Sequence, residues 1–189
     1  MDKDVSAGST TTTLGTLALG LTLLAFGLGH TAVIDGVTAA DAVSIATYVG
    51  GIALFVAGLF AFRDRDTFTG TAFAALAAFW FTWGVTAEAG ASKNAAGLFL
   101  LLFALVALSL TFGSAGSGML SQGTFGLLCV SLLLLGIAQF GESEGLAKVG
   151  GWFAVVAGAA AWYAATAPLA KWPTAVPKRA AHRGVTATG

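Results

Sequence analysis

Side chains that could do chemistry are few in this sequence. His30 falls near the end of the first long apolar stretch, and Glu142 and Glu144 lie just past the end of the fifth. The single cysteine, Cys129, has no second thiol for a disulfide or a metal site and is expected to be a small buried hydrophobe. The sequence holds no Ser-His-Asp set, no metal-spaced His or Cys cluster and no phosphate-binding Gly-x-x-x-x-Gly-Lys motif, which argues against an enzyme and predicts neither cofactor nor metal.

The composition is typical of a chain that is embedded in a lipid bilayer. Of 189 residues, 57% are apolar and 26 are glycine, while charged residues make up 10%; a typical globular domain has about 25%. So little charge cannot cover a water-facing surface, which excludes a soluble enzyme domain and a disordered chain. The net charge of zero, with no basic stretch in the body of the chain, excludes a nucleic-acid-binding protein.

Charged residues divide the chain into apolar intervals that are long enough to cross a bilayer, which takes about 20 helical residues. The interval from Asn94 to Gly141 has 48 residues and contains the small polar string Gly113-Ser-Ala-Gly-Ser-Gly118, so it is expected to hold two crossings. The sequence therefore predicts an all-α integral membrane protein with one six-helix domain. The expected helices span approximately 14–34, 42–62, 67–87, 95–112, 122–140 and 149–170, followed by a basic cytoplasmic tail over 171–189.

Lysine and arginine predict the orientation, because short cytoplasmic loops are enriched in both. Two of these residues, Lys93 and Lys148, fall on the side opposite the termini. Both termini are therefore expected in the cytoplasm, in a multi-pass protein of the cytoplasmic (inner) membrane. Seven share the side of the termini: Lys3, Arg63, Arg65, Lys171, Lys178, Arg179 and Arg183.

The interior of the bundle is expected to be uncharged. No Asp, Glu, Lys or Arg lies well inside an expected helix, whereas proton-driven pumps usually place such residues there. His30 is a candidate proton sensor, and the alternative is an interfacial histidine bonded to water or to a carbonyl. Hydroxyls such as those of Thr22, Ser109 and Thr111 are expected to bond the carbonyl one turn back in their own helix.

Small and bulky residues are unevenly distributed over the expected helices. Helices in lipid associate by close approach at small residues, so stripes of them predict packing seams, with a narrow axial channel as the alternative. Phe79, Trp80 and Trp83 form a bulky patch on the third helix that is equally consistent with lipid contact. The stripes are Gly50, Ala53, Ala57 and Ala61 in the second helix, and Gly150, Ala154, Gly158, Ala161 and Ala165 in the sixth.

Three groups of motifs carry a family resemblance. A Gly-Gly-Ile-Ala…Ala-Gly-Leu helix over Tyr48–Leu59 is followed by Asp66-Thr-Phe-Thr-Gly-Thr-Ala-Phe73 and by Phe79-Trp80. The sixth helix carries Gly-Trp at 151–152 and Gly-Ala-Ala-Ala-Trp-Tyr at 158–163, and Phe-Gly at 112–113 is a weaker agreement. In the order and spacing of these motifs, the chain resembles the acetate uptake transporter (YaaH-like) family, which includes bacterial succinate-acetate permeases.

The resemblance implies a ring-shaped homo-oligomer in the bilayer, typically a hexamer, in which each six-helix protomer has its own path for acetate and, in some members, succinate. Family constriction positions fall on Leu19, Leu76, Gly126 and Ala161. Leucines replace an aromatic residue and a tyrosine at the first two, and the family's Asn-Pro-Ala-Pro-Leu-Gly is here Thr10-Thr-Thr-Thr-Leu-Gly15. The candidates for substrate binding are Thr13, Leu14, Gly15, Thr71 and Tyr163.

The expected function is that of a membrane anion channel or permease for acetate and other small monocarboxylates, or succinate. Backbone amides freed at glycines, with hydroxyls such as those of Thr13 and Thr71, would hold the carboxylate on either side of a leucine-lined gate. A urea or short-amide channel would have the same uncharged, glycine-rich composition. A non-transporting membrane scaffold or an acetate sensor is the alternative from a different class.

Overall fold

The computed structural model describes residues 10–172 of the chain. Within that range six helical spans are long and apolar enough to cross a membrane, which confirms the predicted all-α membrane architecture. The expected tail lies outside the described residues from position 173 onward. The elements are α1 (Thr10–Thr31), α2 (Ala39–Ile45), η1 (Ala46–Ala53), α3 (Leu54–Arg63), α4 (Thr67–Glu88), α5 (Lys93–Gly113), α6 (Met119–Gly141) and α7 (Glu144–Ala170), with α2, η1 and α3 forming the second span.

Polar caps start several helices. The Asp66 carboxylate accepts a hydrogen bond from the backbone N–H of Thr69 at 3.0 Å and so begins α4. The Ser143 hydroxyl accepts one from Leu146 N–H at 3.3 Å and begins α7 at Glu144, five residues before the expected start at 149. A side-chain acceptor at this position satisfies an N–H that has no partner within the helix. Asp66 thus stays at the cap of α4 and Glu144 in the first turn of α7, at the ends of the spans.

The second span is not a uniform α-helix, because its middle, η1, is a π-helix. Such segments are rare and occur often at functional sites. Gly50 and Gly51 lie in η1 and are buried. A Cβ on Gly50 would come within 2.6 Å of the Trp80 ring, and one on Gly51 within 2.8 Å of the Phe81 ring. The π-helix thus presents a glycine pair to two large rings of α4.

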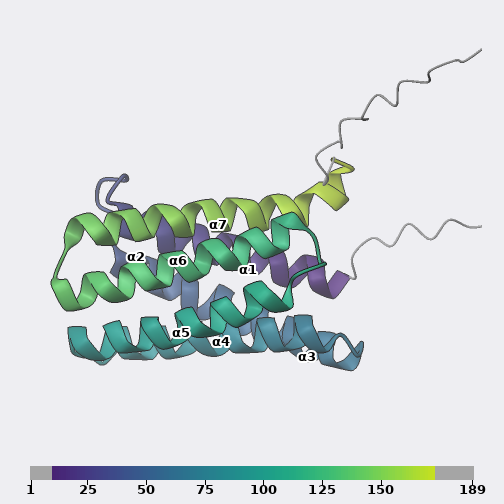
Figure 1. The fold of residues 1–189 in the computed structure, drawn as a ribbon, viewed down its shortest axis with the longest axis horizontal. Helices are drawn as coiled ribbons and strands as arrows, with labels where there is room; N and C mark the ends of the chain where they lie inside the picture. Colours follow the sequence, from purple (N-terminus) through teal and green to yellow (C-terminus); the bar gives the residue numbers. More distant parts are fainter. Residues whose placement is uncertain (1–9, 173–189) are drawn as a thin grey trace, which may run out of the picture.

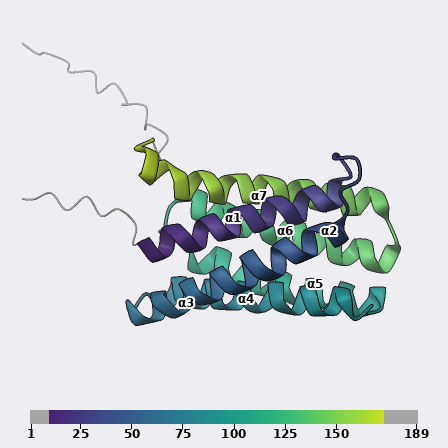
Figure 2. The same cartoon turned by 180° about the vertical axis from the view of Figure 1, so that it is seen from behind.

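The six spans follow one another around a common axis (Figures 1 and 2). α1 packs along α7 on one side and along the second span on the other. α4 packs on η1 and α3, α5 packs on α6, and α6 packs on α7. The backbones of α4 and α5 approach each other at few points, so the junction of these two helices is the loosest in the bundle.

Glycines allow α1 and α7 to pack backbone to backbone. A Cβ on Gly27 would come within 2.6 Å of Val155 N, and a Cβ on Gly158 within 2.7 Å of Leu24 N. A Cβ on Gly150 would similarly meet the Leu135 side chain of α6 at 2.9 Å. The predicted packing seam on the sixth span is therefore confirmed at Gly150 and Gly158.

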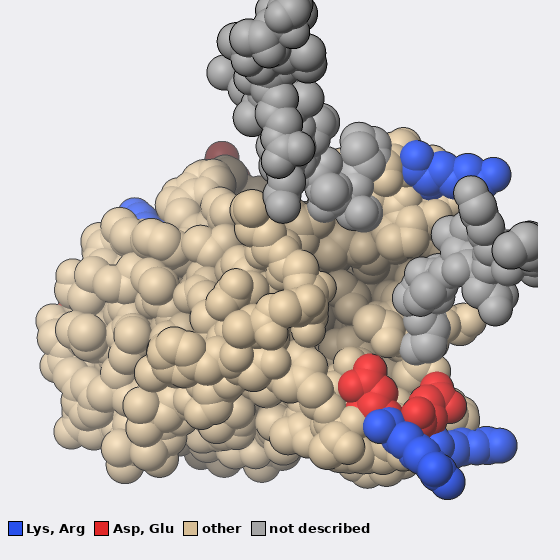
Figure 3. All heavy atoms as spheres, turned by 45° about the vertical axis from the view of Figure 1, so that its right-hand side comes forward, with Lys and Arg blue, Asp and Glu red and all other residues tan. Residues whose placement is uncertain are grey.

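Charged side chains gather at the ends of the bundle, and the face shown in Figure 3 is otherwise uncharged along its length. Arg63, Asp64, Arg65 and Asp66 lie around the turn between α3 and α4. At the opposite end, Lys93 Nζ lies 2.7 Å from Glu142 Oε2, and both side chains are exposed. Large apolar side chains on the lateral surface are also exposed, as expected of a surface that contacts lipid or another protomer.

Candidate functional site

Buried side chains of α1 and α4 meet along the axis, beginning at the end where α1 starts. The Phe73 ring fills the space where a Cβ on Gly15 would lie. One helical turn further on, Leu19 and Leu76 are 2% and 1% exposed and belong to the same apolar core. Residues three or four positions apart share a helix face, so the two leucines follow Gly15 and Phe73 at the next level. The structure thus brings two of the predicted constriction positions together.

The next levels are filled by aromatic rings. Gly50 of η1 touches both Thr22 of α1 and Trp80 of α4, which places these two side chains at one level. The Phe26 ring centroid lies 5.2 Å from that of Trp80 and 5.8 Å from that of Trp83, in edge-to-face geometry. α1 and α4 therefore run in the same direction with their inward faces in register.

Aromatic rings also bridge the loose junction between α4 and α5. The Phe79 ring stacks on Phe99 at a centroid distance of 5.4 Å and contacts Phe103 at 5.1 Å. Phe79, Trp80 and Trp83 are 1%, 0% and 9% exposed. Lipid contact for this patch, left open by the sequence, is therefore wrong, because the three side chains fill the interior.

On α6, leucines rather than Gly126 face the core. A Cβ on Gly126 would face Thr111 Cγ2 of α5 at 3.6 Å. Leu128 and Leu132 are fully buried in the core that holds Leu19 and Leu76. The role of Gly126 in a constriction stays a prediction. On α7, Ala161 is fully buried.

The predicted substrate-binding residues do not form one cluster. Gly15 lies on the axis against Phe73, and Thr13 is half-buried near the start of α1. Leu14 and Thr71 are exposed on the surface of the protomer. Tyr163 is half-buried, and its ring stacks on Trp172 near the end of α7 at 6.0 Å.

Most interior hydroxyls bond within their own helix, as expected. Thr22 donates to the Ala18 carbonyl at 2.7 Å, and Thr111 likewise bonds the carbonyl of Ala107. The exposed Ser109 follows the same pattern and donates to the Leu105 carbonyl at 3.0 Å. Cys129 is buried, and its thiol lies 3.4 Å from the Ala104 carbonyl.

His30 lies at the end of α1 away from Gly15, and its ring packs 4.5 Å from that of Phe26. Its Nδ1 is 2.8 Å from the Phe26 carbonyl oxygen. The structure therefore shows the carbonyl-bonded histidine that was the alternative to a proton sensor. A proton-sensing role stays a prediction.

The indole nitrogen of Trp80 stands apart from these satisfied groups. Among the buried side-chain nitrogens and oxygens of the described residues, Trp80 Nε1 is the atom without a hydrogen-bond partner. Leaving a buried donor unpaired costs about 1–3 kcal/mol. Such an atom in a native core calls for an explanation.

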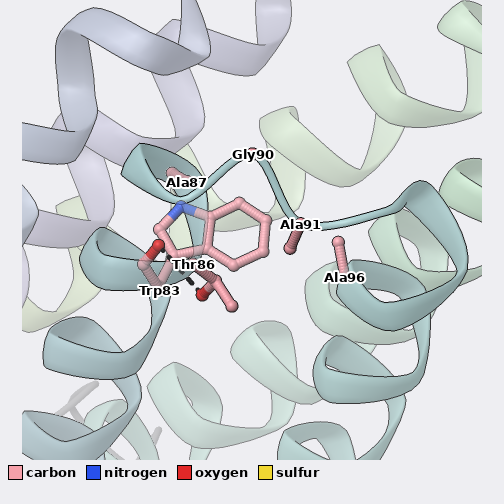
Figure 4. A pocket seen from close by; sticks show the side chains of 6 residues that line it. All are labelled: Trp83, Thr86, Ala87, Gly90, Ala91 and Ala96. Atoms are coloured by element: carbon pink, nitrogen blue, oxygen red, sulfur yellow. Dashed lines mark hydrogen bonds between the residues drawn. The ribbon is translucent and has the colours of Figure 1, made fainter.

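A small pocket opens where α4 turns into α5, at the end of the axis beyond Trp83. It has a volume of about 90 Å³ and is called the α4–α5 pocket. In Figure 4 the Trp83 indole lies beneath the turn that carries Gly90 and Ala91, and the Thr86 hydroxyl bonds back to the Trp83 carbonyl at 3.2 Å. The pocket has room for a few waters or a solute of a few heavy atoms. Its lining residues are Trp83, Thr86, Ala87, Gly90, Ala91 and Ala96.

Among the side chains that the structure describes, no group of three or more His, Cys, Asp and Glu could hold a metal ion. Together, the fold and the axis define a polytopic membrane protein whose interior is filled by leucines and aromatic rings. The chain belongs to the GPR1/FUN34/yaaH family, whose model matches residues 5–176. This membership confirms the resemblance found in the motifs.

Several relatives are transport or regulatory proteins. The chain is 28% identical to the succinate-acetate/proton symporter SatP of Escherichia coli K12 over 159 residues, 78% of this chain and 81% of SatP. It is 29% identical to the glyoxylate pathway regulator of Yarrowia lipolytica, covering 76% of this chain and 57% of that protein. It is 31% identical to the ammonia transport outward protein 2 of Saccharomyces cerevisiae, covering 60% of this chain and 45% of that protein. The chain thus spans about half the length of these two fungal relatives.

The fold also matches a solved structure. The bacterial acetate channel SatP superposes with a TM-score of 0.77 at 25% sequence identity, covering 89% of this chain and 98% of that chain. The two SatP comparisons are thus with transport proteins, a symporter by the name of the relative and a channel by the solved structure.

Proposed function

We propose that this protein is a channel or permease that carries acetate and other small monocarboxylates along the axis of each protomer. The observation that carries the proposal is the fully buried leucine level of Leu19 and Leu76, in a fold that superposes on an acetate channel. Leu128 and Ala161, also fully buried, would complete the constriction.

The dry constriction would select by size and by the cost of moving charge. A small carboxylic acid is almost wholly ionised at pH 7, and a bare charge at the bilayer centre is expensive. A constriction of about one helical turn, 5.4 Å long, keeps the dehydrated section short. The methyl group of acetate would contact the leucines, while the carboxylate finds donors on either side of them.

The assembly and its placement belong to the same proposal. A ring of protomers, a hexamer in the family, would cover part of the exposed apolar lateral surface, and lipid would cover the rest. Both termini would lie in the cytoplasm and the protein in the inner membrane. The arginines of the α3–α4 turn would then face the cytoplasm, as the positive-inside rule requires.

Uptake of labelled acetate into liposomes that contain the purified protein tests this function. Empty liposomes measure permeation of the acid through lipid, which is subtracted. Succinate, urea and ammonium, each in excess, serve as competitors. We expect protein-dependent acetate uptake that unlabelled acetate blocks and urea does not, and block by succinate would extend the substrate range to dicarboxylates.

Two results would contradict the proposal. Free passage of urea with no acetate uptake above empty liposomes would identify a neutral-solute channel. Ammonium-dependent flux without acetate uptake would assign to this chain the activity named for its Saccharomyces relative.

A further inference from the structure

The Trp80 side chain combines complete burial with an unused hydrogen-bond donor. The residue is 0% exposed, and its Nε1 has no acceptor within reach among the described residues. An indole N–H can only donate. The interior of the bundle therefore contains a donor for which the described residues provide no acceptor.

The surroundings of this indole are apolar or already bonded. Its Cδ1, the carbon bonded to Nε1, faces Gly50 of η1 so closely that a Cβ there would come within 2.6 Å. The same Cβ on Gly50 would lie 2.7 Å from the methyl group of Thr22. The Thr22 hydroxyl donates to the Ala18 carbonyl oxygen. The Phe26 ring meets the indole edge to face. The π-helix and the glycine in it thus make room for the indole without offering it an acceptor.

Trp80 also stands at an intermediate point of the axis. Along α4, Leu76, Trp80 and Trp83 are spaced by four and three residues, which puts them on one face. Trp83 lines the α4–α5 pocket, and Leu76 belongs to the leucine level. At a rise of 1.5 Å per residue, Trp80 lies about 6 Å from Leu76 along the helix. A solute that moves from the pocket to the constriction passes this level.

We propose that Trp80 Nε1–H donates a hydrogen bond to a carboxylate oxygen of the solute between the α4–α5 pocket and the Leu19–Leu76 constriction. This inference rests on the proposed function, because it requires acetate to follow the axis of the protomer. The solute breaks no bond within the protein when it binds, since the donor is unpaired in the empty state. An ionised acceptor gains more from such a donor than a neutral one, so the site favours carboxylates over urea, and ammonium, which has only donors, gains nothing.

Two substitutions at position 80 separate the N–H from the shape of the ring. Trp80→Phe removes both the N–H and part of the ring. Replacement of Trp80 by β-(3-benzothienyl)alanine keeps the bicyclic shape and puts sulfur in place of the N–H. We expect both variants to lower acetate uptake into liposomes by about tenfold, the effect of one charge-assisted hydrogen bond. Trp152→Phe, at an exposed position on α7, is the matched control and should keep the wild-type rate.

A spectroscopic measurement reports the bond directly. The chain has five tryptophans, and in protein labelled with ¹⁵N at the indoles each gives its own N–H signal. Titration with sodium acetate, against sodium chloride at equal ionic strength, should move one signal downfield. That signal should be missing from Trp80→Phe, and ammonium chloride should leave it in place.

The outcomes distinguish this inference from the proposed function. Wild-type uptake in the benzothienyl variant, or an acetate titration that moves no indole signal while the wild-type protein transports acetate, would overturn the role of Trp80 alone. Absence of acetate uptake by the wild-type protein would instead overturn the proposed function, and the inference with it.

Discussion

At the scale of single residues, most polar side chains in this interior donate a hydrogen bond to a carbonyl of their own helix. Ser131 instead donates to a carbonyl of another helix. Its hydroxyl donates to the Gly150 carbonyl at 2.8 Å, and both residues are buried. The bond joins α6 to α7, whereas Ser109 bonds within its own helix. In lipid such a bond between helices is worth about 1 kcal/mol.

Ser131→Ala should therefore lower the stability of the purified protein by about 1 kcal/mol, because the Gly150 carbonyl loses its partner from α6. Thermal unfolding in detergent measures the effect as a lower melting temperature. Ser109→Ala is the control and should change the melting temperature little. Equal effects of the two substitutions would show that the bond between α6 and α7 adds nothing.

A second prediction at this scale concerns the leucine level of Leu19 and Leu76. Leu76→Val removes one methylene from the constriction at a cost of about 1 kcal/mol, so the fold should persist. The wider opening should raise the flux of butyrate relative to acetate severalfold, measured by uptake into liposomes. Leu105→Val, at a position that is 59% exposed, should leave the ratio unchanged. An unchanged ratio in Leu76→Val would remove this residue from the constriction.

At the scale of helices, the contact between α1 and α7 depends on the absence of side chains. Gly158→Ala would place a methyl group within 2.7 Å of the Leu24 backbone nitrogen, which cannot rotate away. The two helices would have to separate, at a cost of about 1–3 kcal/mol.

We therefore expect Gly158→Ala to lower the melting temperature in detergent. Gly123→Ala in α6 is the matched control, because a Cβ there meets nothing within 4 Å. It should be neutral or stabilising by up to about 1 kcal/mol through helix propensity. If Gly158→Ala were as stable as the control, α1 and α7 would not be held as closely as described.

Helices could be predicted from this sequence, but the faces they turn inward could not. Charged residues mark the ends of most spans, since charge stays near water, and together with the small polar string at 113–118 they gave the six crossings. Lipid-facing and inward-facing side chains are both apolar, so no periodicity separated Trp80, which is fully buried, from Leu105, which is exposed. The π-helical winding of 46–53 was also missed, because its sequence is an ordinary apolar run and its glycines are matched to rings of α4.

At the scale of the whole molecule, the described charges lie at the two ends, and the orientation follows from which end faces the cytoplasm. Ala91 lies in the connection between α4 and α5, and Ser117 lies in the connection between α5 and α6 at the opposite end. Both residues are exposed, while the native Cys129 is buried.

Single cysteines at these positions test the orientation in a Cys129→Ala background. A membrane-impermeant maleimide should label Ala91→Cys in intact cells, provided that the reagent can reach the outer face of the cytoplasmic membrane. It should label Ser117→Cys only after permeabilisation. The reverse pattern would place the termini outside the cytoplasm and contradict the positive-inside prediction.

The pairing of α1 with α7 also sets the order of assembly during synthesis. Among the described helices α1 is made before the others, and α7, which covers its glycines, is made after them, with Gly20 and Gly158 far apart in the sequence. Contacts between distant parts of a sequence form late. Until α7 leaves the ribosome, Gly20 and Gly27 lack the backbone against which they pack, so a nascent chain that stops at α6 has an open bundle. The six described spans thus form a closed ring only when α7 is inserted.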